Sequence, residues 1–240
     1  MPRFFAQNFD ENNPLIDGSD ASHIAKSLRM KFGEQLTVCD TKGTDYICEI
    51  LDVSDVITLK VLEKQSSSSE PSVEVTLFQC VPKGDKLESI IQKSVELGVA
   101  KIIPVLSVRC VSRPDSKTAA KKQVRYQKIA DSAAGQCGRG ILPEVGEMIT
   151  FSQMKARLKE FDKAIFFYEC GGAPLREAME KTDRKIAIMV GPEGGFDKNE
   201  AQEITDAGAV AVGLGKRILR TETAPIAALS GIMLLTGNLE

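Results

Sequence analysis

The sequence predicts an α/β protein in which a small β-barrel-like domain precedes a larger domain built on a mostly parallel sheet. Two patterns predict this arrangement. Short strand-like segments fill the first 70 residues, and strand-like and helical segments alternate after them. A serine-rich stretch at 65–71 separates the two patterns and indicates a linker. We therefore expect one domain at residues 1–72 and a second at residues 73–240.

The first domain is predicted to consist mainly of strands. Segments 35–39, 45–51 and 56–62 are short and rich in Val, Ile, Leu and Thr, and turn-like residues separate them. One short helix is expected at 19–31, with Ser19 or Asp20 as its cap. These elements together favour a small barrel.

The second domain shows the alternation that is typical of a parallel sheet covered by helices. Two capping boxes, Asp85 with Glu88 and Asp197 with Glu200, are expected to open two of its helices, and Gly98 is expected to end the first of these. The expected strands lie at 73–81, 101–106, 163–168, 185–190 and 209–214. The expected helices lie at 85–98, 116–136, 175–181, 197–207 and 223–235.

Composition narrows the class of protein. Hydrophobic residues make up 42% and charged residues 27%, as in an ordinary globular chain. No apolar run reaches the roughly 18 residues that cross a bilayer, and the first residues do not resemble a signal peptide, so we expect a cytoplasmic protein without a membrane partner. The six cysteines form no Cys-x-x-Cys pair and His23 is the only histidine, so no metal site is expected. His23 is expected to be a partly buried structural residue.

The strongest charge feature is a basic segment at 101–128, which holds eight basic residues and one acid, Asp115. Four of them share one helical stripe, which continues to Gln136 and Arg139. This stripe consists of Lys117, Lys121, Arg125 and Lys128. A separate apolar stripe of Ala120, Val124, Ile129 and Ala133 is expected to pack on the sheet. The basic stripe suits a phosphate backbone, and the alternative is a solvated helix face.

Three successive strands of the second domain end in glycine-bearing turns, at 169–172, 191–195 and 213–215. Ligands of parallel sheets bind beyond the carboxyl ends of the strands, where glycine lets the backbone approach a ligand closely. The turns lack the spacing of a dinucleotide fingerprint or a P-loop. Glu193 and Glu222 lie beside the expected crevice, which suits a ligand with a positive centre.

Six segments together resemble the ribosomal RNA small subunit methyltransferase E family of the SPOUT superfamily. The resemblance spans nearly the whole chain, and the last two segments are the most specific. Ser22 and Cys137 depart from the family, whose members often have histidine and serine there. The segments are 1–5, 22–29, 93–98, 136–139, Val-Gly-Pro-Glu-Gly-Gly-Phe at 190–196 and Leu-Gly-Lys-Arg-Ile-Leu-Arg-Thr-Glu-Thr-Ala-Pro at 214–225.

The resemblance implies a C-terminal SPOUT domain with a deep trefoil knot, an N-terminal PUA-like barrel and a homodimer through the C-terminal domain. It also implies S-adenosylmethionine as methyl donor and methylation of N3 of one uridine in the decoding region of 16S rRNA, as free RNA or in the small ribosomal subunit. The residues that it implies for donor binding are Glu169, Gly191, Pro192, Glu193, Gly194, Gly195, Leu214, Gly215, Ile218, Leu219, Arg220 and Thr223. A branched side chain at Gly194 is expected to fill space that the donor needs.

By the same resemblance, Arg139 and Arg220 would hold RNA phosphate or the developing uridine anion, and Glu193 or Glu222 would accept the proton or orient a group. The residues expected to bind RNA are Arg3, Arg29, Lys121, Arg125, Gln136 and Arg139. Two alternatives stay open. One is a non-catalytic RNA-binding assembly factor, and the other is a SPOUT enzyme that methylates transfer RNA or another rRNA nucleotide.

Overall fold

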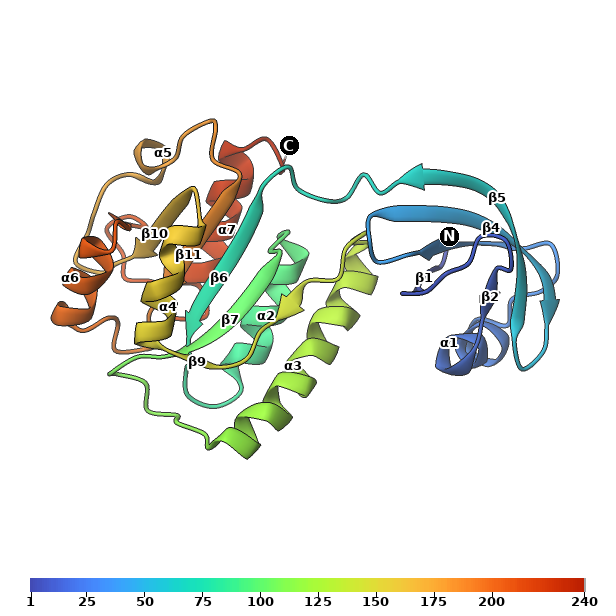
Figure 1. Ribbon diagram of the computed structural model, residues 1–240, viewed down its shortest axis with the longest axis horizontal. Coiled ribbons are helices and arrows are strands. Elements are labelled where there is room, and N and C mark those ends of the chain that lie inside the picture. The colour runs from blue at the N-terminus through green and yellow to red at the C-terminus, as the bar shows by residue number, and fades with distance from the viewer. Residues whose placement is uncertain (240) are drawn as a thin grey trace. The chain divides into compact units, whose positions relative to one another are not determined.

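The computed structural model describes residues 1–239, which divide into two compact units (Figure 1). The first unit is Met1–Glu70 together with Ala134–Leu142, and the second is Pro71–Ala133 together with Pro143–Glu240. The chain therefore leaves the first unit at residue 70, two residues before the expected boundary, and later returns to it. The sequence pattern did not predict this return.

The first unit is built on one curved five-stranded sheet. Its strand order is β1-β3-β4-β5-β2, and every pair is antiparallel except β1 with β3. Two register irregularities between β4 and β5 accompany the curvature of these long strands. Among the described residues β1 and β2 do not pair, so the sheet is wrapped but not closed. The strands are β1 (Arg3–Phe5), β2 (Leu15–Ile16), β3 (Gln35–Cys39), β4 (Thr44–Val53) and β5 (Ile57–Ser66).

One helical segment packs on this sheet, formed by α1 (Gly18–Ser22) and the π-helical turn η1 (His23–Leu28). It ends at Arg29, which has the left-handed conformation with φ 54°, so the expected helix at 19–31 is shorter than predicted. Ile24 anchors the segment in the core beside Leu36 and Ile50. The expectation for His23 is wrong, because its side chain is exposed and only meets the edge of Phe4.

The second unit is a parallel sheet with strand order β12-β10-β11-β6-β7-β8, and β9 also pairs with β7. All pairs in this sheet are parallel, as the alternating pattern predicted. Buried apolar side chains such as Phe78, Phe166 and Ile188 fill both sides of it. The strands are β6 (Glu74–Cys80), β7 (Lys101–Leu106), β8 (Glu144–Val145), β9 (Ile149–Thr150), β10 (Lys163–Phe167), β11 (Lys185–Val190) and β12 (Val210–Val212).

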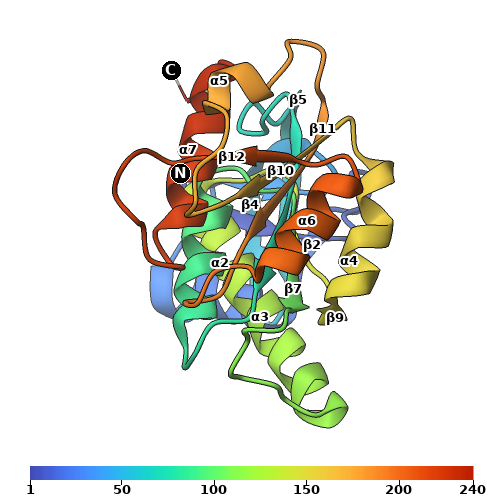
Figure 2. The same cartoon turned by 90° about the vertical axis from the view of Figure 1, so that its left-hand side faces the viewer.

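Helices cover both faces of this sheet. Figure 2 shows α2 and α7 on one face and α4 and α6 on the other, with β10 and β11 between them. No described helix is both long enough and apolar enough to span a bilayer. The helices are α2 (Lys86–Glu96), α3 (Ser116–Cys137), α4 (Phe151–Arg157) with the 3-10 turn η2 (Leu158–Glu160), α5 (Leu175–Ala178), α6 (Lys198–Asp206) and α7 (Ala224–Leu235).

The two expected capping boxes have different outcomes. Asp197 and Glu200 form a complete box at the start of α6. The box at α2 is wrong, because the Asp85 side chain makes no cap hydrogen bond and the Glu88 carboxylate instead accepts a hydrogen bond from Arg125, at 2.8 Å. Gly98 does follow the end of α2, with φ 88°.

The buried face of α3 differs from the expected apolar stripe. Of the expected stripe, Ala133 is buried and Ile129 is half-buried, but Ala120 and Val124 are exposed; Tyr126 and Ala130 are buried as well. The helix also meets the short edge strand β8, whose unpaired backbone groups need polar partners. Gln127 supplies them, because its amide group accepts a hydrogen bond from Val145 N (2.8 Å) and donates one to the carbonyl oxygen of residue 143 (2.9 Å).

Candidate functional site

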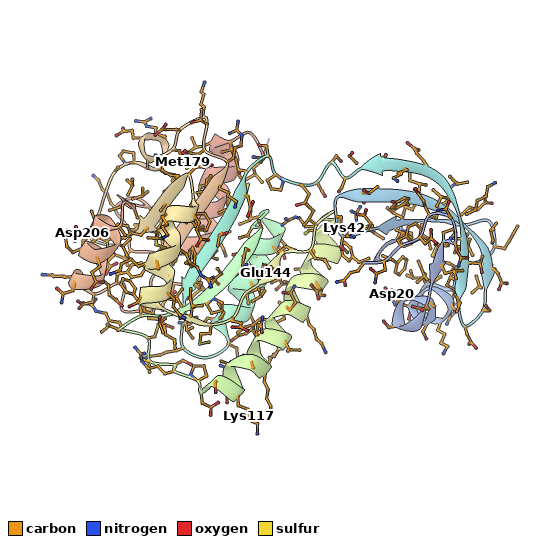
Figure 3. All side chains as sticks on the ribbon, viewed as in Figure 1. Asp20, Lys42, Lys117, Glu144, Met179 and Asp206 are labelled. Atoms are coloured by element: carbon orange, nitrogen blue, oxygen red, sulfur yellow. The ribbon has the colours of Figure 1, made fainter. Side chains whose placement is uncertain are left out.

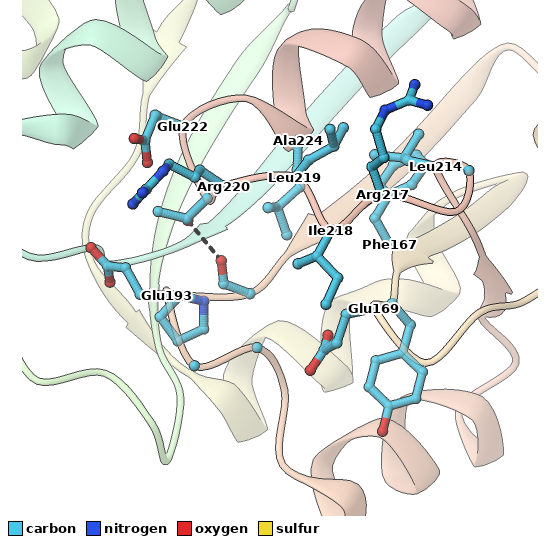
Figure 4. A pocket seen from close by; sticks show the side chains of 18 of the residues that line it. Phe167, Glu169, Glu193, Leu214, Arg217, Ile218, Leu219, Arg220, Glu222 and Ala224 are labelled. Atoms are coloured by element: carbon cyan, nitrogen blue, oxygen red, sulfur yellow. Dashed lines mark hydrogen bonds between the residues drawn. The ribbon is translucent and has the colours of Figure 1, made fainter.

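A cavity of about 380 Å³ lies in the second unit, at the carboxyl ends of β10, β11 and β12 (Figure 4). Its walls are the three glycine-bearing turns that the sequence singled out, together with the segment that leads into α7. Of the residues expected to bind a donor, all line this cavity except Thr223, which is exposed before the first turn of α7. Glu222 also lines it, while Arg139 is not among the described lining residues.

The turn at 191–195 needs glycine at two positions. Gly195 has φ 67°, and a β-carbon there would collide with the carboxylate of Glu169. A β-carbon on Gly191 would lie 3.0 Å from the backbone of Gly195. Gly194 is different, because its missing β-carbon would face Arg109 Cδ at 3.4 Å, which is an ordinary contact. A β-carbon at Gly194 therefore meets Arg109 first, and the expectation that a branched side chain there fills ligand space stays a prediction.

A buried polar pair holds the segment that leads into α7 against the turn at 191–195. Thr221 Oγ1 donates to the carbonyl oxygen of Gly191 at 2.8 Å, and Gln79 Nε2 donates to Thr221 Oγ1 at 3.1 Å. Neither side chain is among the site residues predicted from the sequence. A signal was available for Gln79, because it is a polar residue inside an otherwise apolar strand, and a buried amide needs a hydrogen-bond partner.

Lys86, at the start of α2, sets the electrostatics of one end of the cavity. Its Nζ lies 2.8 Å from Glu193 Oε1 and 3.7 Å from Glu222 Oε2. Burial alone would raise the pKa of Glu193, but hydrogen bonds from Lys86 and from the Lys83 amide outweigh it and lower the pKa. Glu193 is therefore ionised at neutral pH and already has its counter-charge. Lys86 is not among the site residues predicted from the sequence.

Glu222 is held less tightly than Glu193. Its Oε2 atom is shielded from solvent and has no hydrogen-bond partner within residues 1–239. Figure 4 shows Glu222 beside Arg220 and near Glu193, at the opposite end of the cavity from Glu169 and Ile218. Arg220 is exposed, so its guanidinium is accessible to a ligand at the mouth of the cavity. This end therefore combines a fixed carboxylate, a carboxylate with an unused acceptor and an accessible guanidinium.

Ile218 is 80% exposed and lies at the other end of the mouth. Lys216 and Arg217 precede it in the same segment and are also exposed. An apolar side chain flanked by two cations suits a ligand that offers both a flat apolar face and negative charge.

The residues expected to bind RNA fall into two groups. Arg29, Lys121, Arg125 and Gln136 are exposed, although Arg125 also pairs with Glu88. Lys117, which begins the basic stripe, points away from α3 into solvent (Figure 3). Lys117 and Lys121 on α3 are therefore accessible to a polyanion, whereas Arg125 would have to leave Glu88 to bind one.

Arg3 and Arg139 form the second group, because both guanidinium groups are engaged in ion pairs inside the first unit. Arg3 donates to both carboxylate oxygens of Asp45, each at 2.7 Å. Arg139, which is 4% exposed, donates through Nε and Nη2 to Glu70 at 2.9 and 2.7 Å. Glu70 also accepts hydrogen bonds from the amides of Gly140 and Ile141. These contacts indicate that Arg139 stabilises the first unit.

Comparisons with known proteins agree on one family. A family model for an RNA methyltransferase domain matches residues 69–233, and one for an RNA methyltransferase PUA domain matches residues 16–60. The Bacillus subtilis protein named ribosomal RNA small subunit methyltransferase E is 39% identical over 225 residues, which cover 90% of this chain and 88% of that protein. A protein of the same name from Buchnera aphidicola subsp. Schizaphis graminum is 32% identical, covering 100% of this chain and 98% of its own length.

Two solved structures are similar over nearly the whole chain. The ribosomal RNA small subunit methyltransferase E from Neisseria gonorrhoeae, bound to S-adenosyl methionine, has a TM-score of 0.87 and 34% identity, with 98% of each chain covered. A putative methyltransferase from Legionella pneumophila, in complex with the same cofactor, has a TM-score of 0.85 and 29% identity, with 97% of this chain and 96% of that chain covered.

Proposed function

The chain belongs to the ribosomal RNA small subunit methyltransferase E family, and from this membership we propose that it methylates N3 of one uridine in the decoding region of 16S rRNA. The methyl donor is S-adenosylmethionine. The observation that carries the proposal is the cavity at the carboxyl ends of β10, β11 and β12, where three glycine-bearing turns bring the backbone to the ligand.

The residues of the cavity fit this donor. Its volume of about 380 Å³ is within the range of small-molecule sites. Gly191 and Gly195 let this turn close tightly, because a β-carbon on Gly191 would meet the Gly195 backbone and one on Gly195 would meet the Glu169 carboxylate. The donor supplies an electrophilic methyl group on a sulfonium, and the carboxylate of Glu169, beside Gly195, provides negative charge in that wall.

The protein has to remove the proton from uridine N3 and hold the resulting anion. Glu222 is the proton acceptor in this proposal, because it lines the cavity beside Arg220 and is paired only loosely, with Lys86 Nζ at 3.7 Å. Glu193 orients the site through Lys86, since its own carboxylate is already bound by two donors. Arg220 binds the uridine carbonyl oxygens or an adjacent phosphate, because a guanidinium offers a rigid fork of donors. A paired base must first leave its helix, which is the general requirement for chemistry on a base.

The decisive experiment is mass mapping of 16S rRNA nucleosides after incubation of the protein with labelled donor. Free rRNA and small subunits are tested side by side, and Glu222→Gln serves as the matched variant. We expect one 3-methyluridine in the decoding region and a strongly slowed reaction with Glu222→Gln. Methylation of another nucleotide would favour the alternative SPOUT substrate. No methylation, together with no thermal stabilisation by S-adenosylhomocysteine, would favour the non-catalytic assembly factor.

We also propose that the protein acts as a homodimer through the C-terminal unit. Helix α7 is apolar nearly all round, yet Ile226 and Ala227 are only half-buried and Leu234 is 57% exposed. These residues share one face at helical spacing, which suits contact with a second copy. Light scattering at micromolar concentration tests this, and a monomer would contradict it.

The path of the C-terminal segment supports a knot, which we propose as well. Beyond the end of β10 the chain crosses β12 and pairs on its outer side, where Ala173 N donates to Ala211 O at 2.9 Å. After β12 the chain returns to the centre of the sheet, where Thr221 meets Gly191. The proposed knot requires this return to pass through the loop between β10 and β11. Pulling the two ends apart in optical tweezers should give less than the full contour length, and a full contour would refute the knot.

A further inference from the structure

The loop between β7 and α3 reaches the cavity turn from outside the cavity. Arg109 in this loop donates through Nη1 to the carbonyl oxygen of Gly194 at 2.6 Å. Its Nη2 also donates to Asp197 Oδ2 at 3.3 Å. Arg109 itself is not among the described residues that line the cavity. It therefore contacts the wall of the site without contacting the space that a ligand fills.

Arg109 contacts the part of the turn at 191–195 whose backbone is the most flexible. Gly194 and Gly195 are consecutive glycines, so many backbone conformations are open to the peptide bond between them. The Gly195 amide at one end of this peptide donates to the carbonyl oxygen of Pro192 at 2.9 Å. Arg109 holds the carbonyl at the other end. The two hydrogen bonds together fix the orientation of the peptide, and without Arg109 only one end is held.

The position of Arg109 is itself set by the start of α6. The amide of Val108, its neighbour, donates to Glu200 Oε1 at 2.7 Å. The other oxygen of this buried carboxylate accepts from the Asp197 amide at 3.1 Å, which completes the capping box. The loop and the turn are thus connected through one carboxylate as well as through the arginine. Arg109 therefore has a defined position, from which its hydrogen bond to Gly194 stabilises one conformation of the turn at 191–195.

We propose that Arg109 is a positioning residue for the methyl donor, acting through the peptide bond between Gly194 and Gly195. The inference rests on the proposed function, because it takes the cavity as the donor site. In this proposal a residue outside the cavity preorganises the glycine-bearing turn at 191–195. Preorganisation raises affinity by lowering the cost of ordering the site when the ligand binds.

The test compares Arg109→Ala, Arg109→Lys and the wild-type protein in calorimetric titrations with S-adenosylhomocysteine. Arg184→Ala is the matched control, because this exposed arginine also donates to backbone carbonyls of a surface turn but lies away from the cavity. We expect Arg109→Ala to weaken binding about tenfold, the scale of one charge-assisted hydrogen bond at a partly exposed site. Lysine should restore part of the loss, and the control should bind normally. The melting temperature without ligand should stay unchanged in Arg109→Ala.

Steady-state kinetics separate positioning from other roles. A higher KM for the donor with a nearly unchanged kcat supports positioning. Equal affinity of Arg109→Ala and wild type, or a loss of ligand-free stability as large as the loss of affinity, would overturn the inference. A fall in kcat with normal donor affinity would also overturn it, because Arg109 would then act on the RNA. A wild-type protein that does not bind S-adenosylhomocysteine would instead contradict the proposed function.

Discussion

Removing the Arg139 guanidinium should destabilise the first unit. This outcome would show a structural role for Arg139, in contrast to the catalytic or RNA-binding role expected from the sequence. The perturbation is Arg139→Met, which keeps most of the side-chain volume and removes the charge. In the wild-type protein the guanidinium is buried and bound to Glu70, whose side chain is 18% exposed. The variant therefore leaves a largely buried carboxylate without its cation.

The magnitude follows from the contacts of Glu70. Breaking a buried ion pair on one side costs about 3–5 kcal/mol, because the remaining charge is uncompensated. The amides of Gly140 and Ile141 still donate to Glu70, so we expect the lower end, about 3 kcal/mol, for Arg139→Met. Adding Glu70→Gln to this variant removes the orphaned charge and should recover part of the loss. The coupling in the double-mutant cycle should exceed about 1 kcal/mol.

The pH dependence has a definite sign. Burial alone would raise the pKa of Glu70, but the hydrogen bonds from Arg139 and the two backbone amides outweigh it and lower the pKa below its ordinary value of 4.5. A carboxyl group whose pKa is lower in the folded state stabilises that state above its unfolded pKa. This contribution is therefore complete at neutral pH, and it is lost as the pH falls below about 4.5 and through the folded pKa.

The assay has to report on the first unit separately. The chain has no tryptophan, so hydrogen exchange followed by mass spectrometry is the suitable probe. Peptides from β3, β4 and β5 should exchange faster in Arg139→Met, while peptides from β10 and β11 provide the internal reference. Unchanged exchange in β3–β5, together with a large loss of methyl transfer, would refute the structural assignment and restore Arg139 to the chemistry.

Three further predictions concern the site and the basic stripe. Gly195→Ala should lower donor affinity at least tenfold, because residue 195 has a positive φ and its new β-carbon would meet the Glu169 carboxylate. Gly194→Ala should change donor affinity less than about threefold. Equal effects of the two variants in calorimetry would contradict the assigned geometry. Arg220→Ala should keep donor affinity but slow single-turnover methylation by roughly 10²-fold, the scale for losing one preorganised donor, and a near-normal rate would remove this arginine from the mechanism. Replacing both Lys121 and Arg125 with Glu should weaken RNA binding by a factor that shrinks as the salt concentration rises, which filter binding at several salt concentrations can measure. Unchanged RNA binding at low salt would show that the basic stripe is only a solvated surface.

The sequence predicted those parts of the fold whose signal is local. Strands β3, β7 and β11 begin and end at the expected residues, because each is a short buried run of apolar residues bounded by polar ones. The three glycine-bearing turns were placed at one edge of the sheet because the carboxyl ends of parallel strands meet there. The same reasoning missed α4, although its capping box of Thr150 and Gln153 is a local signal that was present in the sequence.

The remaining features depend on contacts between residues far apart in the chain. The pairing of Arg139 with Glu70 joins residues 69 positions apart, and no spacing rule predicts it. Lys86 became part of the site only because α2 begins beside the turn at 191–195. On α3, Tyr126 is buried and Val124 is exposed, and Gln127 bonds to the edge strand β8; the apolar periodicity of the helix predicts neither feature.

The return of the chain to its first unit has a consequence for synthesis on the ribosome. Domains generally fold as units, with the N-terminal one first, while the chain is still being made. Here the first unit needs residues 134–142, so it cannot be completed when residue 70 has emerged. By the time residue 142 is available, β6, α2, β7 and α3 have already left the ribosome. The N-terminal unit therefore stays incomplete until residue 142 has emerged, and a translational pause between residues 70 and 134 would leave it exposed to proteases.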